Sequence, residues 1–234
     1  FDSVAWLSAI SHEVASQPIG RVDNYGYPVP YTVSQLTGAY QSTPDFLASQ
    51  HPIEDRADAE AFIARLEQFG TEVGFDTART REDAARGFIP PDFIIDKTLK
   101  QLQLLRSQPG AKSPMTESLV KRTAAKGIAG DWGRRAERII DGPLAKALDA
   151  QIAAVADPRP RATHDPGMRT RPGGEAYYQL CLRYQTSTRL SPDQAHDLGL
   201  AQVAELSAEA DRLLRAEGHT EGTVGSRLSA LTRD

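Results

Sequence analysis

The segment DRADAEAFIARLEQFG, residues 55–70, carries the periodicity that decides the fold class. Its apolar residues recur at spacings of three and four, which places them on one face of a helix. They are Ala59, Phe62, Ile63, Leu66 and Phe69. Asp55 is suited to the N-cap and Gly70 to the stop. The segment therefore predicts an amphipathic helix.

The same pattern recurs on both sides of this segment. Residues 91–106 carry a second apolar stripe, with Pro91 suited to the first turn. Residues 134–156 are also predicted to be helical, with a kink or a break at Gly142-Pro143. The first sixteen residues indicate a further helix. No alternating run of useful length predicts a strand, so we expect an all-α or nearly all-α array of helices.

The clearest helix start in the chain lies at Ser191. Ser191 can cap the helix, Pro192 suits its first position, and Gln194 is placed for the reciprocal half of a capping box. This start predicts a long helix over residues 192–217.

The Pro-, Gly- and Arg-rich segment 157–174 is the predicted boundary within the chain. We expect a helical scaffold region over residues 1–160. Residues 161–234 would then hold this loop, a pair of tyrosines and the long capped helix. Both regions are expected to belong to one incomplete domain.

Composition excludes some functions. The chain has 234 residues, 27 Lys plus Arg and 31 Asp plus Glu, a formal charge of −4, and no basic run. This balance disfavours nucleic-acid binding, which requires neutralisation of phosphates. No apolar run approaches the roughly 20 residues of a membrane helix. The single cysteine, Cys181, leaves the compartment open between cytoplasmic and periplasmic or secreted.

No local metal motif appears. His12 and Glu13 resemble the start of the zinc-peptidase pattern HExxH, but position 16, where the second histidine belongs, is Ser16. No two of the five histidines lie within one helical turn of each other. We therefore expect no metal to be bound by this chain alone.

Two adjacent tyrosines, Tyr177 and Tyr178, are candidate functional residues. Their hydroxyls could hold a substrate carbonyl or stabilise an oxyanion. Structural packing is the alternative explanation for both.

His196 is the third candidate, because it opens an apolar stripe on the predicted helix 192–217. The stripe is His196, Gly199, Val203, Leu206, Ala210 and Leu213. We expect this face to be buried. His196 would then be either a hydrogen-bonded core residue or a cleft-lining neutral imidazole near the positive end of the helix.

Five further stretches belong together: PYTVSQLTGAY (30–40), DAEAFIARL (58–66), ARGFIPPDFIIDKTLKQL (85–102), PGGEAYYQLCLRYQTST (172–188) and LSPDQAHDLGLAQVAEL (190–206). Together they resemble one bacterial family of unknown function, DUF885. They occur in the family's order and cover most of the chain from about Pro30 onward. The resemblance implies a mostly helical, zinc-dependent, peptidase-like hydrolase. Its zinc motif, a His-Glu pair followed by Pro-Gly-His, would lie downstream of Asp234.

The resemblance also suggests substrate-binding residues. Tyr31 and Gln35 match the family's P-Y-x-x-x-Q element. Tyr177 and Tyr178 match P-x-G-x-x-Y-Y, and His196 matches H-x-x-G-L. By this resemblance we expect these five residues to face the substrate, while the catalytic assignment stays open among Tyr177, Tyr178 and His196.

Two functions are compatible with the sequence. In the first, the chain supplies the helical wall and part of the cleft for a peptide or small amide substrate. Zinc and its ligands would come from a missing C-terminal half or a companion chain. In the second, the chain is a non-catalytic helical module that binds a peptide or a partner. A stripe meant to pack on a missing half should leave an apolar patch exposed.

Overall fold

The computed structural model describes residues 2–16, 20–22 and 28–232. The chain divides into two compact units. The larger comprises Ser11–Tyr178, and the smaller comprises Phe1–Ile10 with Gln179–Asp234. The division falls inside helix α8 (Gly174–Thr186), a few residues beyond the Pro/Gly-rich segment in which the sequence places its boundary.

Helices dominate the described residues, and the predicted all-α class is confirmed. Helix α1 (Asp2–Ala15) contributes to both units. The larger unit then contains α2 (Ala39–Asp45), α3 (Arg56–Ala85), α4 (Asp92–Ser107), α5 (Pro114–Ala125), α6 (Trp132–Ile139) and α7 (Ala145–Ala156). Short π or 3-10 turns occupy Phe46–Gln50, Gly110–Lys112, Ile140–Leu144, Arg159–Arg161 and Met168–Thr170. Two-residue strands, β1 (Arg21–Val22) and β2 (Pro28–Val29), pair antiparallel with Arg21 opposite Val29.

Helix α3 begins where the sequence predicts and ends later. The Asp55 carboxylate accepts a hydrogen bond from the Asp58 backbone N–H at 3.0 Å, so the N-cap is confirmed. The predicted stop at Gly70 is wrong, because the helix continues for fifteen more residues to Ala85. The buried face continues with it through Val73, Asp76, Thr77 and Asp83. Packing of this face outweighs the low helix propensity of one glycine.

The end of α3 is a Schellman motif. Gly87 has φ +80°, a conformation that glycine adopts without strain. The Phe88 N–H donates to the Asp83 carbonyl at 2.9 Å, and the Gly87 N–H donates to the Ala84 carbonyl at 3.1 Å. Phe88, which follows Gly87, is buried and its ring packs against that of Tyr31.

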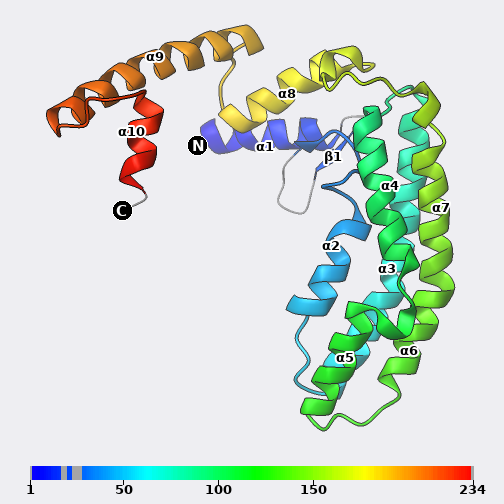
Figure 1. Cartoon of the computed structure of the whole chain (residues 1–234). Helices are drawn as coiled ribbons and strands as arrows, with labels where there is room; N and C mark the ends of the chain where they lie inside the picture. The colour runs from blue at the N-terminus through cyan, green and yellow to red at the C-terminus, as the bar shows by residue number, and fades with distance from the viewer. Residues whose placement is uncertain (1, 17–19, 23–27, 233–234) are drawn as a thin grey trace. The chain divides into compact units, whose positions relative to one another are not determined.

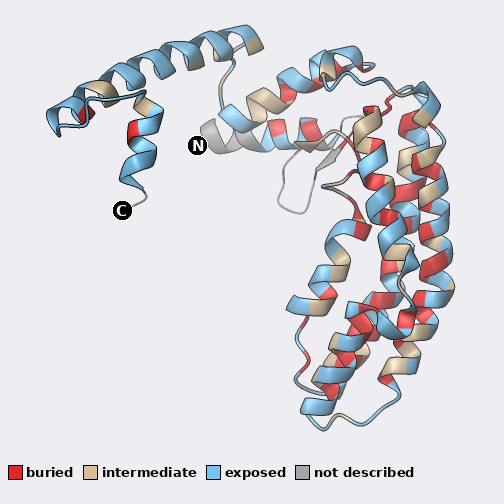
Figure 2. Ribbon diagram, viewed as in Figure 1, coloured by how far each residue is buried: buried red, intermediate tan, exposed pale blue. Residues whose placement is uncertain are grey.

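The core of the larger unit forms where α3, α4 and α7 run side by side (Figure 1). Its centre contains Phe62, Leu66, Phe69, Val73, Ile95, Leu102 and Leu148, all almost fully buried. Figure 2 shows these helices with buried residues on their facing sides. At Gly142-Pro143, where the sequence predicts a kink or a break, a π turn over Ile140–Leu144 replaces the α-helical pattern between α6 and α7.

The smaller unit is built around α9 (Pro192–Ala216) and α10 (Val224–Leu231). The predicted capping box is present: the Gln194 N–H donates to Ser191 Oγ at 3.1 Å, and the Ser191 N–H donates to Gln194 Oε1 at 2.9 Å. The helix ends at Ala216, and Gly218, with φ +84°, lies two residues beyond it.

The predicted burial of the α9 stripe is wrong. His196 is exposed, and Val203 and Leu206 expose 64% and 67% of their surface. Figure 2 shows most of α9 in the colour of exposed residues. The apolar face is therefore present as predicted, and the described residues of the smaller unit do not cover it. An exposed face of this kind is what the sequence predicts for a stripe that packs on polypeptide outside the chain.

Candidate functional site

Tyr31 lies in an ordered loop that packs on the end of α3. Tyr31 is buried, and its ring centroid lies 5.6 Å from that of Phe88. The Thr37 hydroxyl donates to the Tyr31 carbonyl at 2.8 Å, and the Tyr40 hydroxyl lies 2.6 Å from the Ser34 carbonyl. These contacts make Tyr31 part of the packing that holds loop 30–38 in place.

Gln35, in the same loop, is half-buried. Its side-chain oxygen, Oε1, is buried and has no hydrogen-bond partner among the described residues, and the same is true of Thr32 Oγ1. A buried polar atom without a partner loses roughly 1–3 kcal/mol relative to a satisfied one. The loop therefore carries two polar atoms whose hydrogen-bonding capacity is unused within the described part of the chain.

The tyrosine pair divides into one buried and one exposed residue. Tyr177 is 4% exposed, and Tyr178 is 47% exposed. A Cβ added at Gly20, where φ is +72°, would lie 2.8 Å from the Tyr177 hydroxyl oxygen and 2.6 Å from the Val29 carbonyl. Gly20 is thus required for the close approach of this loop to Tyr177. Tyr177 fits the structural alternative, whereas the Tyr178 phenol remains accessible.

A charged cluster in the C-terminal half of α3 connects these two regions. Arg79 lies 3.2 Å from the Asp83 carboxylate and donates to the Gly20 carbonyl at 3.4 Å. One helical turn earlier along the same face, the Asp76 carboxylate accepts from the Ala39 N–H at 2.7 Å. The loop that carries Gly20 and the segment after loop 30–38 are therefore both tied to α3 by charged side chains.

Asp83 is the titratable group of this cluster. It is 5% exposed, and burial raises the pKa of its carboxyl above the ordinary value, although Arg79 and Arg86 act in the opposite direction. Asp83 therefore keeps its proton to a higher pH than a free carboxyl would.

Sequence reasoning missed this cluster, although a signal was present. Val73, Asp76, Thr80 and Asp83 continue the stripe of α3 at spacings of four and three beyond Phe69. Carboxylates on the apolar face of a helix are rarely buried without partners. The continued stripe, with its two aspartates, would have predicted both the longer helix and the buried charges.

His51 is a second buried group that the sequence did not single out. It is fully buried, between the rings of Phe46 and Phe62. Its Nδ1 donates to the Pro52 carbonyl at 2.6 Å, so Nε2 is the acceptor for the Arg65 guanidinium. Arg122 donates to the His51 carbonyl. Burial, reinforced by the two arginines, lowers the pKa of His51, and the imidazole is held in its neutral form.

His196 belongs to the smaller unit, on the exposed face of α9. The expectation that it lines a buried face is corrected by its exposure. The close association that the sequence suggests for it with Tyr177 and Tyr178 stays a prediction, because these residues belong to different units.

The described residues of the chain bring no three His, Cys, Asp or Glu side chains together in an arrangement that could hold a metal ion. They therefore do not fit a zinc site. The prediction of zinc in the complete protein concerns residues outside this chain and stays a prediction.

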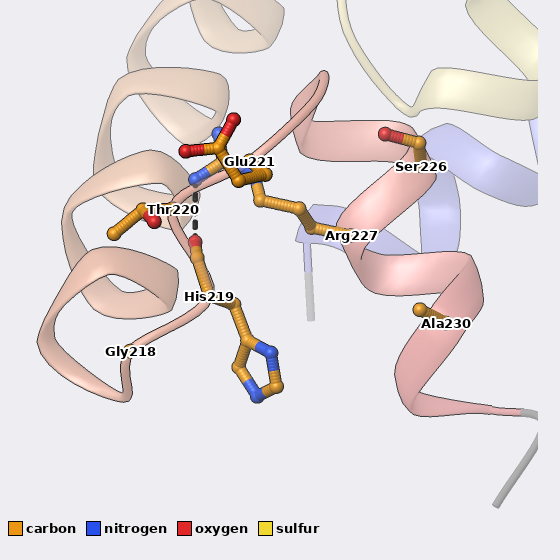
Figure 3. A pocket seen from close by; sticks show the side chains of 7 residues that line it. All are labelled: Gly218, His219, Thr220, Glu221, Ser226, Arg227 and Ala230. Atoms are coloured by element: carbon orange, nitrogen blue, oxygen red, sulfur yellow. Dashed lines mark hydrogen bonds between the residues drawn. The ribbon is translucent and has the colours of Figure 1, made fainter.

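An open hollow of about 440 Å³ lies at the corner between α9 and α10 (Figure 3). Its most buried lining residue is Arg227, which binds the Asp211 carboxylate and donates to the carbonyls of His219 at 3.0 Å and Thr223 at 3.4 Å. The His219 imidazole and the Glu221 carboxylate point in different directions (Figure 3). The guanidinium of Arg227 donates its hydrogen bonds to residues of the corner itself. We therefore attribute the hollow to the packing of α10 on α9 through Arg227.

The sequence matches the family model described as bacterial protein of unknown function (DUF885) over residues 3–234. The chain belongs to this family. The DUF885 match extends to the first 30 residues, which the five resembling stretches did not cover. No curated protein matches the chain.

A solved structure shares the fold of this DUF885 chain. It is described as "the putative lipoprotein from Colwellia psychrerythraea", with a TM-score of 0.84 and 24% sequence identity. The match covers 97% of this chain and 40% of that chain, so the present chain spans less than half the length of the protein it resembles. None of the helices in residues 2–16, 20–22 and 28–232 combines the length and apolar character that crossing a membrane requires.

Proposed function

We propose that this chain forms the helical wall and part of the substrate cleft of a peptidase-like, zinc-dependent hydrolase that acts on a peptide or small amide. The reaction class rests on the resemblance of the sequence to such hydrolases. Zinc, its ligands and the general base would lie on polypeptide outside these 234 residues. Family membership and the coverage of 40% of a solved relative support the view that this is one section of a larger protein.

The observation that carries the proposal is the difference in burial between Tyr177 and Tyr178. Tyr177 is buried and packs against Gly20, which fixes the start of α8 on the larger unit. Tyr178 follows it on the same helix and is 47% exposed. A rigid side chain with one accessible hydroxyl is suited to donate a hydrogen bond to a substrate carbonyl.

The proposal divides the five candidates by role. Tyr178 would contact substrate. Tyr31 and Tyr177 would act as positioning residues through loop 30–38 and Gly20. Gln35 would contribute its unused Oε1 if loop 30–38 moves on binding. His196 would act only when α9 is covered by a partner.

Substitution of the two tyrosines in the complete protein tests this division. Tyr178→Phe should lower kcat/KM on fluorogenic peptides or small amides by about 10-fold or more, because it removes one hydrogen-bond donor, and should leave the unfolding midpoint unchanged. Tyr177→Phe should shift the unfolding midpoint instead. Unchanged turnover in both variants would contradict the proposal.

Metal analysis provides an independent test of the reaction class. The complete protein should contain stoichiometric zinc, and residues 1–234 purified alone should contain none. Stoichiometric zinc on this chain alone, or a zinc-free complete protein that hydrolyses at full rate, would overturn the proposal.

A second candidate function is a non-catalytic module that binds a helical partner, and the exposed apolar face of α9 favours it. Partner binding by a complete protein that contains no zinc and hydrolyses no peptide would support this function over the first.

A further inference from the structure

The exposed face of α9 has the spacing of a coiled coil. Its six members alternate between intervals of three and four residues: His196, Gly199, Val203, Leu206, Ala210 and Leu213. We refer to these six residues as the α9 seam. Such an alternation is a heptad repeat with a mean period of 3.5, which keeps one narrow face turned toward a single neighbouring helix. The geometry therefore fits a helix as the cover, running nearly parallel or antiparallel to α9.

Ion pairs occupy part of the surface of α9 outside the seam, where Leu198 and Leu200 are also 49% and 58% exposed. Arg212 pairs with Glu209 at 2.6 Å, and Arg215 pairs with Asp211 at 2.7 Å. Arg227 of α10 also binds Asp211. The polar face is thus occupied by its own ion pairs and by α10, whereas Val203 and Leu206 in the middle of the seam are about two-thirds exposed.

Two of the six positions of the α9 seam carry small residues. Gly199 has no side chain, and a Cβ built there would meet nothing within 4 Å. Ala210 contributes one methyl group. The seam therefore has two shallow positions, one turn from each end, on either side of the larger side chains of Val203 and Leu206.

A second copy of α9 fits these positions poorly. In a parallel pair each residue meets its own copy, so Gly199 faces Gly199 and Ala210 faces Ala210. In an antiparallel pair centred between positions 204 and 205, Gly199 faces Ala210. Both arrangements place small against small and leave voids, each of which costs about 1 kcal/mol or more when it reaches the size of a methyl group.

We infer that the α9 seam is the docking surface for an amphipathic helix from polypeptide outside these 234 residues, with bulky apolar side chains opposite Gly199 and Ala210. The longer solved relative indicates where such a helix would come from. It shares this fold with a TM-score of 0.84, and 60% of its own length lies outside the match (100 − 40). The inference rests on the proposal that this chain is one section of a larger protein, and it adds the kind of element that covers α9.

Site-specific photocrosslinking in the source cells tests the occupant. A benzoylphenylalanine at Leu206 should crosslink several-fold more than one at Ala208, which lies on the opposite face of α9. The crosslinked peptide, identified by mass spectrometry, should be an amphipathic helical segment outside these 234 residues. A crosslink to α9 of a second copy, or a yield at Leu206 no higher than at Ala208, would overturn the inference.

The two shallow positions allow a second test on the purified chain. The wild-type chain should have the mass of a monomer, 25.5 kDa, by light scattering. Gly199→Leu with Ala210→Leu fills the voids and should produce a two-fold larger mass, whereas Ala201→Leu with Ala204→Leu on the opposite face should not. A wild-type dimer that Leu206→Glu dissociates would overturn the inference, as would a filled variant that stays monomeric.

The outcomes separate this inference from the proposed function. A crosslink between two copies of α9 would refute the heterotypic helix and leave the tyrosine and zinc experiments unaffected. Inactive, zinc-free complete protein with a crosslinked helix at Leu206 would refute the hydrolase and leave the docking surface in place.

Discussion

Helices α3 and α9 have the same kinds of start and stop signals and differ in whether their apolar stripe is buried. Both begin at a capping side chain, Asp55 or Ser191, and a glycine with positive φ lies two residues beyond the end of each. Both carry an apolar stripe at spacings of three and four. The α3 stripe is buried against the other helices of the larger unit, whereas the α9 seam is exposed. Local sequence thus specifies a helix and its apolar face, and the partner of that face depends on polypeptide that need not lie in the same chain.

The largest expected effect comes from shortening a side chain in α3. Leu66 is fully buried in the core, so Leu66→Ala should lower the free energy of unfolding by about 2–5 kcal/mol through lost burial and a residual cavity. The matched change in α9, Leu206→Ala, should alter it by no more than about 0.5 kcal/mol in the isolated chain. Urea unfolding followed by circular dichroism measures both.

The comparison would fail if the two leucines behaved alike. A loss of several kcal/mol for Leu206→Ala in the isolated chain would mean that the seam is already covered there. In the complete protein we expect the opposite, because Leu206→Ala should become destabilising once a helix packs on the seam.

A smaller effect is expected from pH, through His51 in the larger unit. His51 is buried neutral, so its folded-state pKa lies below the ordinary value of about 6.5. The unfolded chain therefore binds more protons than the folded chain in the window below that value, and stability falls as pH decreases through it. Arg65, Arg122 and Asp58 face His51, and the arginines make a protonated imidazole more unfavourable.

Unfolding free energies measured from pH 7.5 to 5 check this expectation. The His51→Gln variant removes the titratable group, so its stability should change less with pH over this window than that of the wild type. Equal slopes for the two proteins would show that His51 titrates with the same pKa in both the folded and the unfolded state.

Much of the fold follows from local signals in the sequence. The caps at Asp55 and Ser191 and the interruption at Gly142-Pro143 were predicted, because each depends on residues within one or two turns of one another. The stop predicted at Gly70 is wrong because tertiary packing carries α3 past it to the left-handed glycine at position 87. Gly87 is the better stop signal, since it requires the positive φ that a Schellman motif uses.

The candidate site was less accessible to sequence reasoning. The ties among Gly20, Arg79 and Tyr177, and among His51, Arg65 and Arg122, join residues far apart in the chain, so no local spacing predicts them. Resemblance selected Tyr177 and Tyr178 together and could not separate them. Burial separates them, because one tyrosine packs against Gly20 and the other faces outward.

Hydrogen exchange of α9 tests the central claim most directly. Amide exchange would be compared between the purified 234-residue chain and the complete protein, with α3 as the internal reference. We expect the α9 amides from His196 to Leu213 to exchange much more slowly in the complete protein, and those around Leu66 to be protected in both proteins. Equal exchange of α9 in the two proteins would contradict the claim that this face is covered by another helix.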